Sequence, residues 1–431
     1  MQPVRISDRL SVVPQPSPDE FAAFAAAGYA ALVNARPDGE ENGQPGNAAE
    51  RAAADGAGMA YRFIPVMGSN ITTADVRAFQ EAVAQAKGPT LAHCKTGLRA
   101  LMLHVIDEVL DHRMAREDVD SFGSRHGFDL SGAGRWLDRE AKRVPVVEGF
   151  FDQRTRSIQY VVSDPTTKRC AIVDPVLDFD ERSGATGTTN ADALLAYVEA
   201  HELTVDWILD THPHADHFSA ATYLKGKTGA PIAIGARVTS MQTLWQSLYN
   251  WPALATDGSQ WDRLFTAGDT FQIGSIEARV LSSPGHTLAS ITYLIGDAAF
   301  VHDTVFMPDS GTARVDFPGG SASDLWHSIQ EILGLPDETR LFTGHDYQPG
   351  GRHPRWESSV ADQKRANPHL NGISEAEFVT LRESRDKTLP MPKLILHALQ
   401  VNLRGGRLPE PEANGTRYLK FPLDVLVGST W

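Results

Sequence analysis

The sequence predicts an α/β protein with two domains joined by a helical segment. Its 431 residues exceed what a single hydrophobic core normally supports, so more than one domain is expected. In residues 1–112, short apolar runs alternate with helical runs at the spacing of a parallel sheet. In residues 147–431, His and Asp recur directly after strand-like runs, which predicts a second domain. The polar residues 113–146 between them are expected to form helices and a linker.

The N-terminal elements follow from start and stop signals along the chain. Ser17 and Pro18 open a helix, because proline is tolerated at the first helical turn. Gly88 and Pro89 end another helix just before an apolar run. We expect strands at 10–13, 30–34, 61–66 and 90–93, and helices at 21–27, after residue 48, at 73–87 and at 100–110.

Cys94 lies between the last of these strands and the last of these helices. A cysteine just before a helix faces unpaired backbone N–H groups and the positive end of the helix dipole. These groups favour the thiolate and form a cradle for anions. Arg99 can hold an anionic or persulfidic group there, and His93 can support the loop. The alternative is a buried, inert thiol, which is how we interpret Cys170.

The motif from His93 to Arg99 resembles the loop of dual-specificity phosphatases, but it is one residue shorter. Four residues separate Cys94 from Arg99, which is the rhodanese length and suits a single sulfur atom. A phosphatase also needs a general acid, and residues 65–70 offer none. The resemblance therefore implies a phosphatase-like fold with sulfurtransferase chemistry, in which Cys94 and Arg99 are catalytic. A phosphatase remains the alternative.

The second domain contains a cluster of metal-binding residue types. The stretch from Thr211 to His217 holds three imidazoles and a carboxylate, and it follows an apolar run, 205–210, that predicts a buried strand. Neutral imidazole and carboxylate are common ligands of zinc and of non-haem iron. The alternative, a solvated His-rich turn, would crowd polar groups without a compensating partner.

Three later motifs repeat this arrangement at strand ends. His286 follows the apolar run 277–281, Asp303 ends the second arm of a predicted hairpin, and His345 follows the run 340–342. The order of motifs resembles the metallo-β-lactamase superfamily over residues 147–407, which implies an αβ/βα sandwich. His302 neighbours Asp303 but is expected on the other face of the strand, so it is not a predicted ligand. The candidate ligands are His212, His214, Asp216, His217, His286, Asp303 and His345.

Composition limits the partners of the protein. A formal net charge of −14 argues against nucleic acid, whose partners concentrate Lys and Arg. No apolar run approaches the roughly 20 residues of a membrane helix, and the first residues lack a secretory signal. Only two cysteines occur, so no disulfide framework is expected and a cytoplasmic location is predicted. The sequence leaves a homo-oligomer open.

Three segments favour one branch of the superfamily. Persulfide dioxygenases have segments similar to three parts of this sequence. These parts are residues 311–317, the run from Gly344 to Tyr347, and residues 367–368 together with 402–406. A cysteine often found in the last segment is Gly405 here. The resemblance implies that Arg314 and Tyr347 contact the carrier of the substrate sulfur; the alternative is an ordinary salt bridge and a buried ring.

The same resemblance implies one Fe(II) per metal domain, held by His212, His286 and Asp303. Two His and one carboxylate leave open positions for water, O2 and a sulfur atom. The alternative is Zn(II), one or two ions, because the full ligand set also suits a dinuclear hydrolase. His214, Asp216, His217 and His345 would then orient the ligands around iron or complete a second metal site.

The whole chain resembles bacterial β-lactamase hydrolase-like proteins, which are linked to hydrogen sulfide detoxification. This resemblance implies that the metal domain oxidises a glutathione-type persulfide with O2 to sulfite and thiol. The Cys94 domain would transfer sulfane sulfur between small thiols and sulfite or thiosulfate. The alternative is a dinuclear zinc thioester hydrolase, similar to glyoxalase II, fused to a Cys-dependent phosphatase; a scaffold without catalysis is disfavoured by the intact ligand set.

Overall fold

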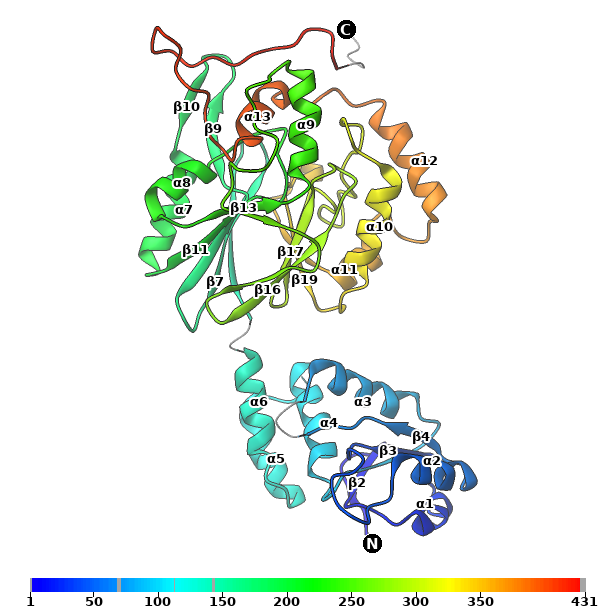
Figure 1. Cartoon of the computed structure of the whole chain (residues 1–431). Coiled ribbons are helices and arrows are strands. Elements are labelled where there is room, and N and C mark those ends of the chain that lie inside the picture. The colour runs from blue at the N-terminus through cyan, green and yellow to red at the C-terminus, as the bar shows by residue number, and fades with distance from the viewer. Residues whose placement is uncertain (1, 68–70, 112, 142–143, 427–431) are drawn as a thin grey trace. The chain divides into compact units, whose positions relative to one another are not determined.

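The protein divides into two compact units, Met1–Ala141 and Lys142–Trp431. In this computed structural model, residues 2–67, 71–111, 113–141 and 144–426 are described (Figure 1). The segment 65–70, expected to lack a general acid, is therefore described only as far as Met67. Residues 142 and 143, near the expected linker, also lie outside the described residues.

The N-terminal unit is built on a five-stranded sheet of order β1-β2-β5-β3-β4. Strands β2, β5, β3 and β4 are parallel, as the alternation of strands and helices predicts. Strand β4 ends earlier than expected, at Phe63, because Pro65 cannot donate to a sheet ladder. The strands are β1 (Val4–Arg5), β2 (Leu10–Val13), β3 (Ala31–Asn34), β4 (Ala60–Phe63) and β5 (Thr90–His93). The helices are η1 (Pro18–Glu20), α1 (Phe21–Ala26), α2 (Asn47–Gly56), α3 (Thr73–Gln85), α4 (Leu98–Leu110), η2 (Arg116–Asp118), α5 (Val119–His126) and α6 (Ser131–Ala141).

Helices α5 and α6, from the segment expected to join the domains, pack on the core of the N-terminal unit. Val119, Leu130 and Trp136 are buried there against α4. The indole Nε1 of Trp136 donates to the carbonyl oxygen of Ile71 at 2.7 Å. The N-terminal unit therefore extends through residue 141 rather than ending at residue 112.

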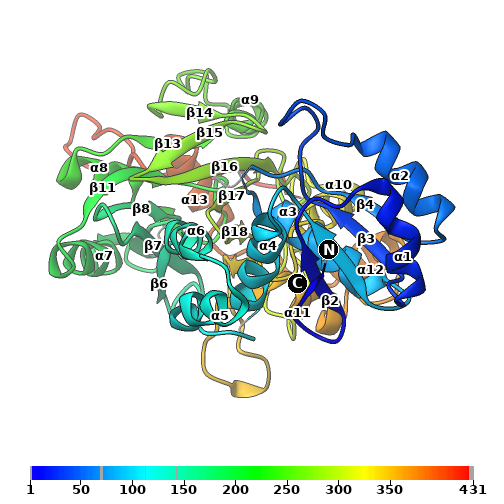
Figure 2. The ribbon, with the colours of Figure 1, turned by 90° about the horizontal axis from the view of Figure 1, so that it is seen from below.

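The second unit is a sandwich of two six-stranded sheets, of order β14-β13-β11-β8-β7-β6 and β15-β16-β17-β18-β19-β20 (Figures 1 and 2). A three-stranded sheet, β10-β9-β12, lies at one end. The strands are β6 (Val146–Phe151), β7 (Ile158–Asp164), β8 (Arg169–Val173), β9 (Val176–Asp180), β10 (Ala185–Gly187), β11 (Thr204–Leu209), β12 (Phe218–Ser219), β13 (Ile232–Gly235), β14 (Arg263–Phe265), β15 (Thr270–Ile273), β16 (Ile276–Ser282), β17 (Ile291–Ile295), β18 (Ala298–His302), β19 (Arg340–Thr343) and β20 (Glu357–Ser359). The helices are α7 (Thr189–Ala200), α8 (Ala221–Thr228), α9 (Val238–Leu248), α10 (Ala322–Leu333), η3 (Pro349–Gly351), α11 (Val360–Ala366), α12 (Glu375–Asp386) and α13 (Ile395–Asn402).

Side-chain alternation along the strands creates the layers of this sandwich. On β8, Ala171 and Val173 face the core between the sheets, whereas Cys170 and Ile172 face the helices that cover the outer face. The outer face of the second sheet packs on α10, α11 and α12 in the same way. The architecture is thus the αβ/βα sandwich that the sequence predicts, with a helix layer on each outer face.

The predicted metal motifs lie where strands of both sheets end. His212 follows β11, His286 follows β16, Asp303 follows β18 and His345 follows β19. Two buried tyrosines near these strand ends donate to main-chain oxygens, Tyr160 to Thr343 and Tyr293 to Asp210. The sheets therefore hold the four motifs in one region. The hairpin arm β6 was not predicted from the sequence.

His302 does not lie where strand alternation predicts. A register shift falls between Phe300 and His302, and the backbone φ of His302 is 38°. Its ring packs 5.1 Å from the ring of His212, and its Nε2 lies 3.1 Å from Thr304 Oγ1. Among the residues that the structure describes, the candidate metal clusters do not include His302, in line with the prediction that it is not a ligand.

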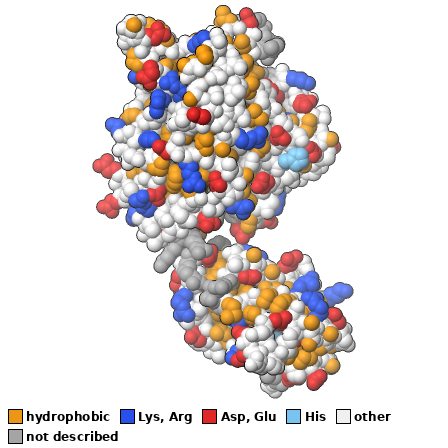
Figure 3. Space-filling view, viewed as in Figure 1, with side chains coloured by type: hydrophobic (Ala, Val, Ile, Leu, Met, Phe, Trp, Pro, Cys, Tyr) orange, Lys and Arg blue, Asp and Glu red, His pale blue; other side chains and the backbone are white. Residues whose placement is uncertain are grey.

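Within the described part of the chain, none of the helices has the length and apolar character needed to cross a membrane. On the face shown in Figure 3, acidic and basic side chains are interspersed over each unit.

Candidate functional site

The candidate ligands His212, His286 and Asp303 converge on one point. Their ligand atoms all lie within 4.8 Å of one another, and all three residues are buried. The distance from Asp303 Oδ2 to His286 Nε2 is 3.5 Å, and that to His212 Nε2 is 3.8 Å. A metal ion bound at roughly 2.0–2.2 Å from each ligand would fit between such atoms.

A second group, formed by His214, Asp216 and His217, lies beside the first. His345 stands between the two groups, because its Nε2 is 3.4 Å from Oδ2 of Asp303 and 3.4 Å from Oδ2 of Asp216. All seven residues singled out from the sequence are therefore brought together. Their positions allow one metal ion with polar neighbours, or two adjacent ions.

The hydrogen bonding of the histidine rings fits metal binding. His286 Nδ1 lies 2.8 Å from the carbonyl oxygen of Arg314, so that nitrogen carries the proton and Nε2 is left for a metal. His212 Nδ1 lies 3.0 Å from Thr211 Oγ1. The Nε2 atoms of His212 and His217 are buried without a hydrogen-bond partner among the described residues. Buried nitrogens of this kind are costly unless something binds them.

The electrostatics of the pocket also favour a cation. Burial lowers the pKa of His212 well below its usual value, and neighbouring imidazoles lower it further, so the ring is neutral as a metal ligand must be. Burial opposes ionisation of Asp303, but His345 and His286 outweigh it and lower the pKa of Asp303. Burial likewise opposes a charge on His345, yet Asp303 and Asp216 raise its pKa to about 10. The carboxylates thus give the pocket a negative potential.

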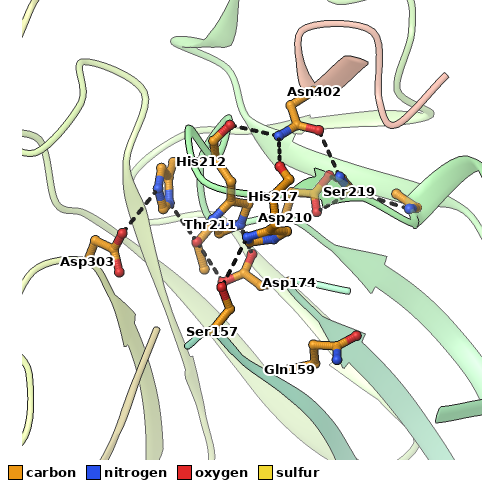
Figure 4. Close-up of polar contacts among 12 residues, drawn as sticks. Ser157, Gln159, Asp174, Asp210, Thr211, His212, His217, Ser219, Asp303 and Asn402 are labelled. Atoms are coloured by element: carbon orange, nitrogen blue, oxygen red, sulfur yellow. Dashed lines mark hydrogen bonds and ion pairs between the residues drawn. The ribbon is translucent and has the colours of Figure 1, made fainter. Parts of the chain in front are cut away.

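Residues around the ligands hold the loop after β11 in place (Figure 4). Asp174 accepts hydrogen bonds from the backbone N–H of Thr211 at 2.7 Å and from its hydroxyl at 2.8 Å. Asp174 also contacts Nε2 of His214, at 3.0 Å, which leaves Nδ1 of that ring for a metal. Ser157 donates to Asp216 Oδ2 at 2.9 Å. Asp174 was missed from the sequence, although it directly follows β8 just as the predicted ligands follow their strands.

Asn402 fixes the same loop from the last helix of the domain (Figure 4). Its amide Nδ2 donates to the main-chain oxygens of His214 and His217, both at 2.7 Å, and its Oδ1 accepts from the N–H of Ser219 at 2.8 Å. Gly406 lets the following chain pass close to this loop, because a Cβ there would lie 2.5 Å from the oxygen of Ser219. The C-terminal segment picked out from the sequence therefore supports the metal loop.

Replacing Asn402 with alanine should weaken the metal loop. Three buried main-chain groups would lose their partner, and each buried unsatisfied group costs about 1–3 kcal/mol. We expect a lower midpoint of thermal unfolding and metal affinity weaker by roughly 10–100-fold, as for other residues that orient ligands. Titration with a chelator measures the affinity. Asn371→Ala is the matched control, since its amide bonds only to Arg365 near the surface, and an equal loss in that variant would contradict the role of Asn402.

The candidate substrate residues border a cavity of about 390 Å³ beside Asp303 and His345. Tyr347 is 52% exposed, and its ring stacks on His345 with the ring centroids 5.6 Å apart. Arg314 makes a bidentate salt bridge with Asp316, with both contacts at 2.7 Å, and donates to the oxygen of Pro390. Contact of Tyr347 and Arg314 with substrate stays a prediction, although both residues line the cavity.

The second predicted site surrounds Cys94, at the end of β5. Gly97, with φ 89°, caps α4 and turns the chain into the helix, so Cys94 is buried near the helix start. Arg99 lies in the first turn of α4, five residues after Cys94, and donates to the oxygen of Val66 at 2.9 Å. Cys94 and Arg99 are thus adjacent, as predicted. Burial raises the pKa of Cys170 to about 12, which fits its interpretation as an inert thiol.

A buried contact between an imidazole and a carboxyl group lies next to the cysteine loop. His93 Nε2 is 3.0 Å from Glu50 Oε2, and both side chains are fully buried. Glu50 also accepts hydrogen bonds from Asn34 at 2.9 Å and Gln15 at 2.8 Å. Glu50 on α2 is a partner of His93 that the sequence did not reveal, and support of the loop by His93 stays a prediction.

Family models match both units. Residues 4–110 match the phosphatase-like domain of β-lactamase hydrolase-like proteins, and residues 157–345 match the metallo-β-lactamase superfamily. Members of that superfamily bind divalent metal ions, so the clusters described above are the candidate metal site of this chain.

Three curated relatives and one crystal structure resemble the chain. A β-lactamase hydrolase-like protein of Agrobacterium fabrum is 68% identical over the full length of both chains. Glyoxylase B2 of Dictyostelium discoideum is 44% identical over 65% of this chain and 97% of its own. The mitochondrial persulfide dioxygenase ETHE1 of Bos taurus is 28% identical over 65% of this chain and 97% of its own. The crystal structure of ETHE1 from Myxococcus xanthus aligns with a TM-score of 0.50 and 32% identity, and covers 61% of this chain and all of that one.

Proposed function

Because the chain belongs to the family of β-lactamase hydrolase-like proteins, we propose that it is a two-site enzyme of persulfide metabolism. The metal domain would oxidise a low-molecular-weight thiol persulfide with O2, and the Cys94 domain would transfer sulfane sulfur. In the first reaction R–S–SH, O2 and water give R–SH, sulfite and two protons. Both cysteines are free, which suits the reducing cytoplasm that we propose as the location.

The grouping of two imidazoles with one carboxylate, His212, His286 and Asp303, carries the proposal for the metal domain. This donor set is the facial triad of non-haem iron oxygenases, and it leaves neighbouring positions open for substrates. Fe(II) held there would supply the redox chemistry that joins O2 to sulfur. The similarity to persulfide dioxygenases over this domain supports the same assignment.

The residues of this chain would hold and position the persulfide. The cavity of about 390 Å³ leads to Asp303 and is bordered by Arg314, Arg382 and Arg385. Arg314 and Arg382 are paired there with Asp316 and Asp386. Arg385 would suit a carboxylate of a glutathione-type carrier, since guanidinium groups bind carboxylates in two-point contacts. Phe306, Phe317 and Tyr347 line the same cavity and limit the access of water.

The placement of Cys94 directly after β5, with Arg99 in the first turn of the following helix α4, carries the proposal for the N-terminal domain. The Cys94 thiolate would attack the outer sulfur of R–S–SH, forming a new S–S bond while the bond to R–S breaks. R–S⁻ leaves with the electron pair and takes a proton from water, and Cys94 keeps the sulfur as a persulfide. Sulfite would then attack this sulfur and leave as thiosulfate, which regenerates the Cys94 thiolate.

Metal content tests the proposed oxidation most directly. Protein purified without oxygen should contain one iron per chain by elemental analysis, and its O2 uptake with glutathione persulfide should follow the iron content. Active protein that holds two tightly bound zinc ions and takes up no O2 would contradict the proposal.

A second candidate function is hydrolysis of a thioester by two zinc ions. This function is favoured by the group of His214, Asp216 and His217, because a second ion could bind there. His345 lies between this group and Asp303, so its side chain is close to both candidate metal positions. The similarity to glyoxylase B2 points the same way. Hydrolysis of a glutathione thioester without O2 uptake would establish this function instead.

A further inference from the structure

Glu40, in the loop before α2, forms a salt bridge with Arg99 of the Cys94 site. Glu40 Oε2 accepts from Arg99 Nη2 at 2.9 Å and from Arg36 Nε at 2.6 Å, so one oxygen bridges two guanidinium groups. The exposed fractions of the side chains are 11% for Arg99, 20% for Glu40 and 4% for Arg36. This bridge is therefore largely shielded from solvent, where ion pairs are stronger than at an exposed surface.

Both terminal nitrogens of Arg99 have hydrogen-bond partners. Nη1 donates to the oxygen of Val66 at 2.9 Å, while Nη2 donates to Glu40. Burial opposes the charge of Arg99, but the hydrogen bond to Glu40 and the proximity of Cys94 outweigh it and raise the pKa of Arg99. The hydrogen bond from Arg99 is also the main reason that the pKa of Glu40 is lowered. Glu40 is therefore an ionised carboxylate next to the Cys94 site.

Other charged side chains around the Cys94 loop are also paired. Glu41 Oε2 accepts from Arg36 at 2.7 Å, and its other oxygen pairs with Lys95. The cations of Arg36, Lys95 and Arg99 are thus each paired with the carboxylate of Glu40 or Glu41. A site for a doubly charged oxyanion would instead present an unpaired guanidinium to two oxygens.

We propose that Glu40 is a specificity-determining residue of the Cys94 site, which weakens the binding of doubly charged oxyanions such as phosphate monoesters and thiosulfate. This inference rests on the proposed sulfur transfer at Cys94. An oxyanion must displace Glu40 from Arg99 and remain close to its charge, whereas the outer sulfur of an organic persulfide needs no second anion site. Glu40 thus favours organic persulfides as sulfur donors and rejects phosphate by charge, in addition to the short loop.

Glu40→Gln tests the proposal, because glutamine keeps the shape and removes the charge. Inorganic phosphate should protect Cys94 from alkylation by iodoacetamide, and its dissociation constant is read from the concentration dependence of protection. We expect this constant to fall by about tenfold in Glu40→Gln, which corresponds to about 1.4 kcal/mol. The KM for thiosulfate should fall by a similar factor, while the KM for an uncharged organic persulfide should change much less.

Two variants separate charge from contact. Glu41→Gln removes a neighbouring carboxylate that touches Arg36 and Lys95 but not Arg99, so it should change phosphate protection less than Glu40→Gln. Glu40→Asp keeps the charge and should retain weak phosphate binding, which also tests the idea if the Glu40→Gln protein does not fold. Equal protection in wild type and Glu40→Gln would overturn the proposal, as would an equal effect of Glu41→Gln.

The result of the phosphate-protection experiment does not depend on whether Cys94 transfers sulfur. Protection by phosphate measures oxyanion binding whether or not Cys94 transfers sulfur. Absence of sulfur transfer in the wild-type protein would refute the proposed function, whereas unchanged phosphate affinity in Glu40→Gln would refute only the role of Glu40.

Discussion

Replacing His286 with alanine is expected to abolish metal binding and O2 consumption with glutathione persulfide. His286 is one of only three residues in the group that includes His212 and Asp303, and its free Nε2 lies 3.5 Å from Asp303. Mutation of a residue that only orients a ligand lowers metal affinity or activity by roughly 10–100-fold. Loss of a ligand itself should therefore lower activity by more than about 100-fold. Elemental analysis and an oxygen electrode measure the two effects.

Two further variants make this test specific. His327→Ala removes an exposed imidazole on α10 and should leave both iron content and O2 uptake near the wild-type values. His345→Ala should reduce turnover more than occupancy, because His345 lies between the two groups rather than within the three-residue cluster. Full iron occupancy in His286→Ala would show that this cluster does not hold the metal.

Exchange of sulfur between thiosulfate or a persulfide and a small thiol should be lost when Cys94 is replaced with serine. The nucleophile of the proposed transfer is the Cys94 sulfur, and a serine hydroxyl at neutral pH is a far weaker nucleophile towards sulfur. The metal cluster belongs to the other compact unit, so persulfide oxidation should persist in the same variant. With thiosulfate as the donor, sulfur exchange is followed by the release of sulfite, and oxidation is followed by the uptake of O2.

Cys170→Ala is the matched control for this variant. Cys170 is buried in the second unit, and burial raises its pKa to about 12, so its removal should not affect sulfur exchange. Exchange that persists in Cys94→Ser would refute the sulfurtransferase role. Efficient release of phosphate from aryl phosphates that depends on Cys94 would instead establish the phosphatase alternative.

The sequence predicts the two α/β units and the convergence of the candidate metal ligands, because both depend on local patterns. His212, His286, Asp303 and His345 each stand directly after an apolar strand, and strand ends of packed sheets meet in space. Strand alternation misplaced the side chain of His302, because a register shift lies between Phe300 and His302.

The residues that support the sites could not be predicted in this way. Asn402 reaches a main-chain oxygen 188 positions earlier in the sequence, and Glu40 contacts an arginine 59 positions later. The loop that carries Glu40 shows only a polar composition in the sequence. Such contacts depend on how distant segments pack, which periodicity along one strand or helix does not encode.

The position of Asn402 also affects when the metal site can form during synthesis. A chain made from its N-terminus tends to fold domain by domain, so the Cys94 unit can be complete while the second unit is still being translated. The loop with His214 and His217 emerges early in that second unit, but the amide that fixes it arrives only with α13. If these residues hold a metal, we expect stable loading to be a late event in the biogenesis of this protein. A chain interrupted before residue 402 would contain all seven candidate ligands but lack the amide that fixes their loop.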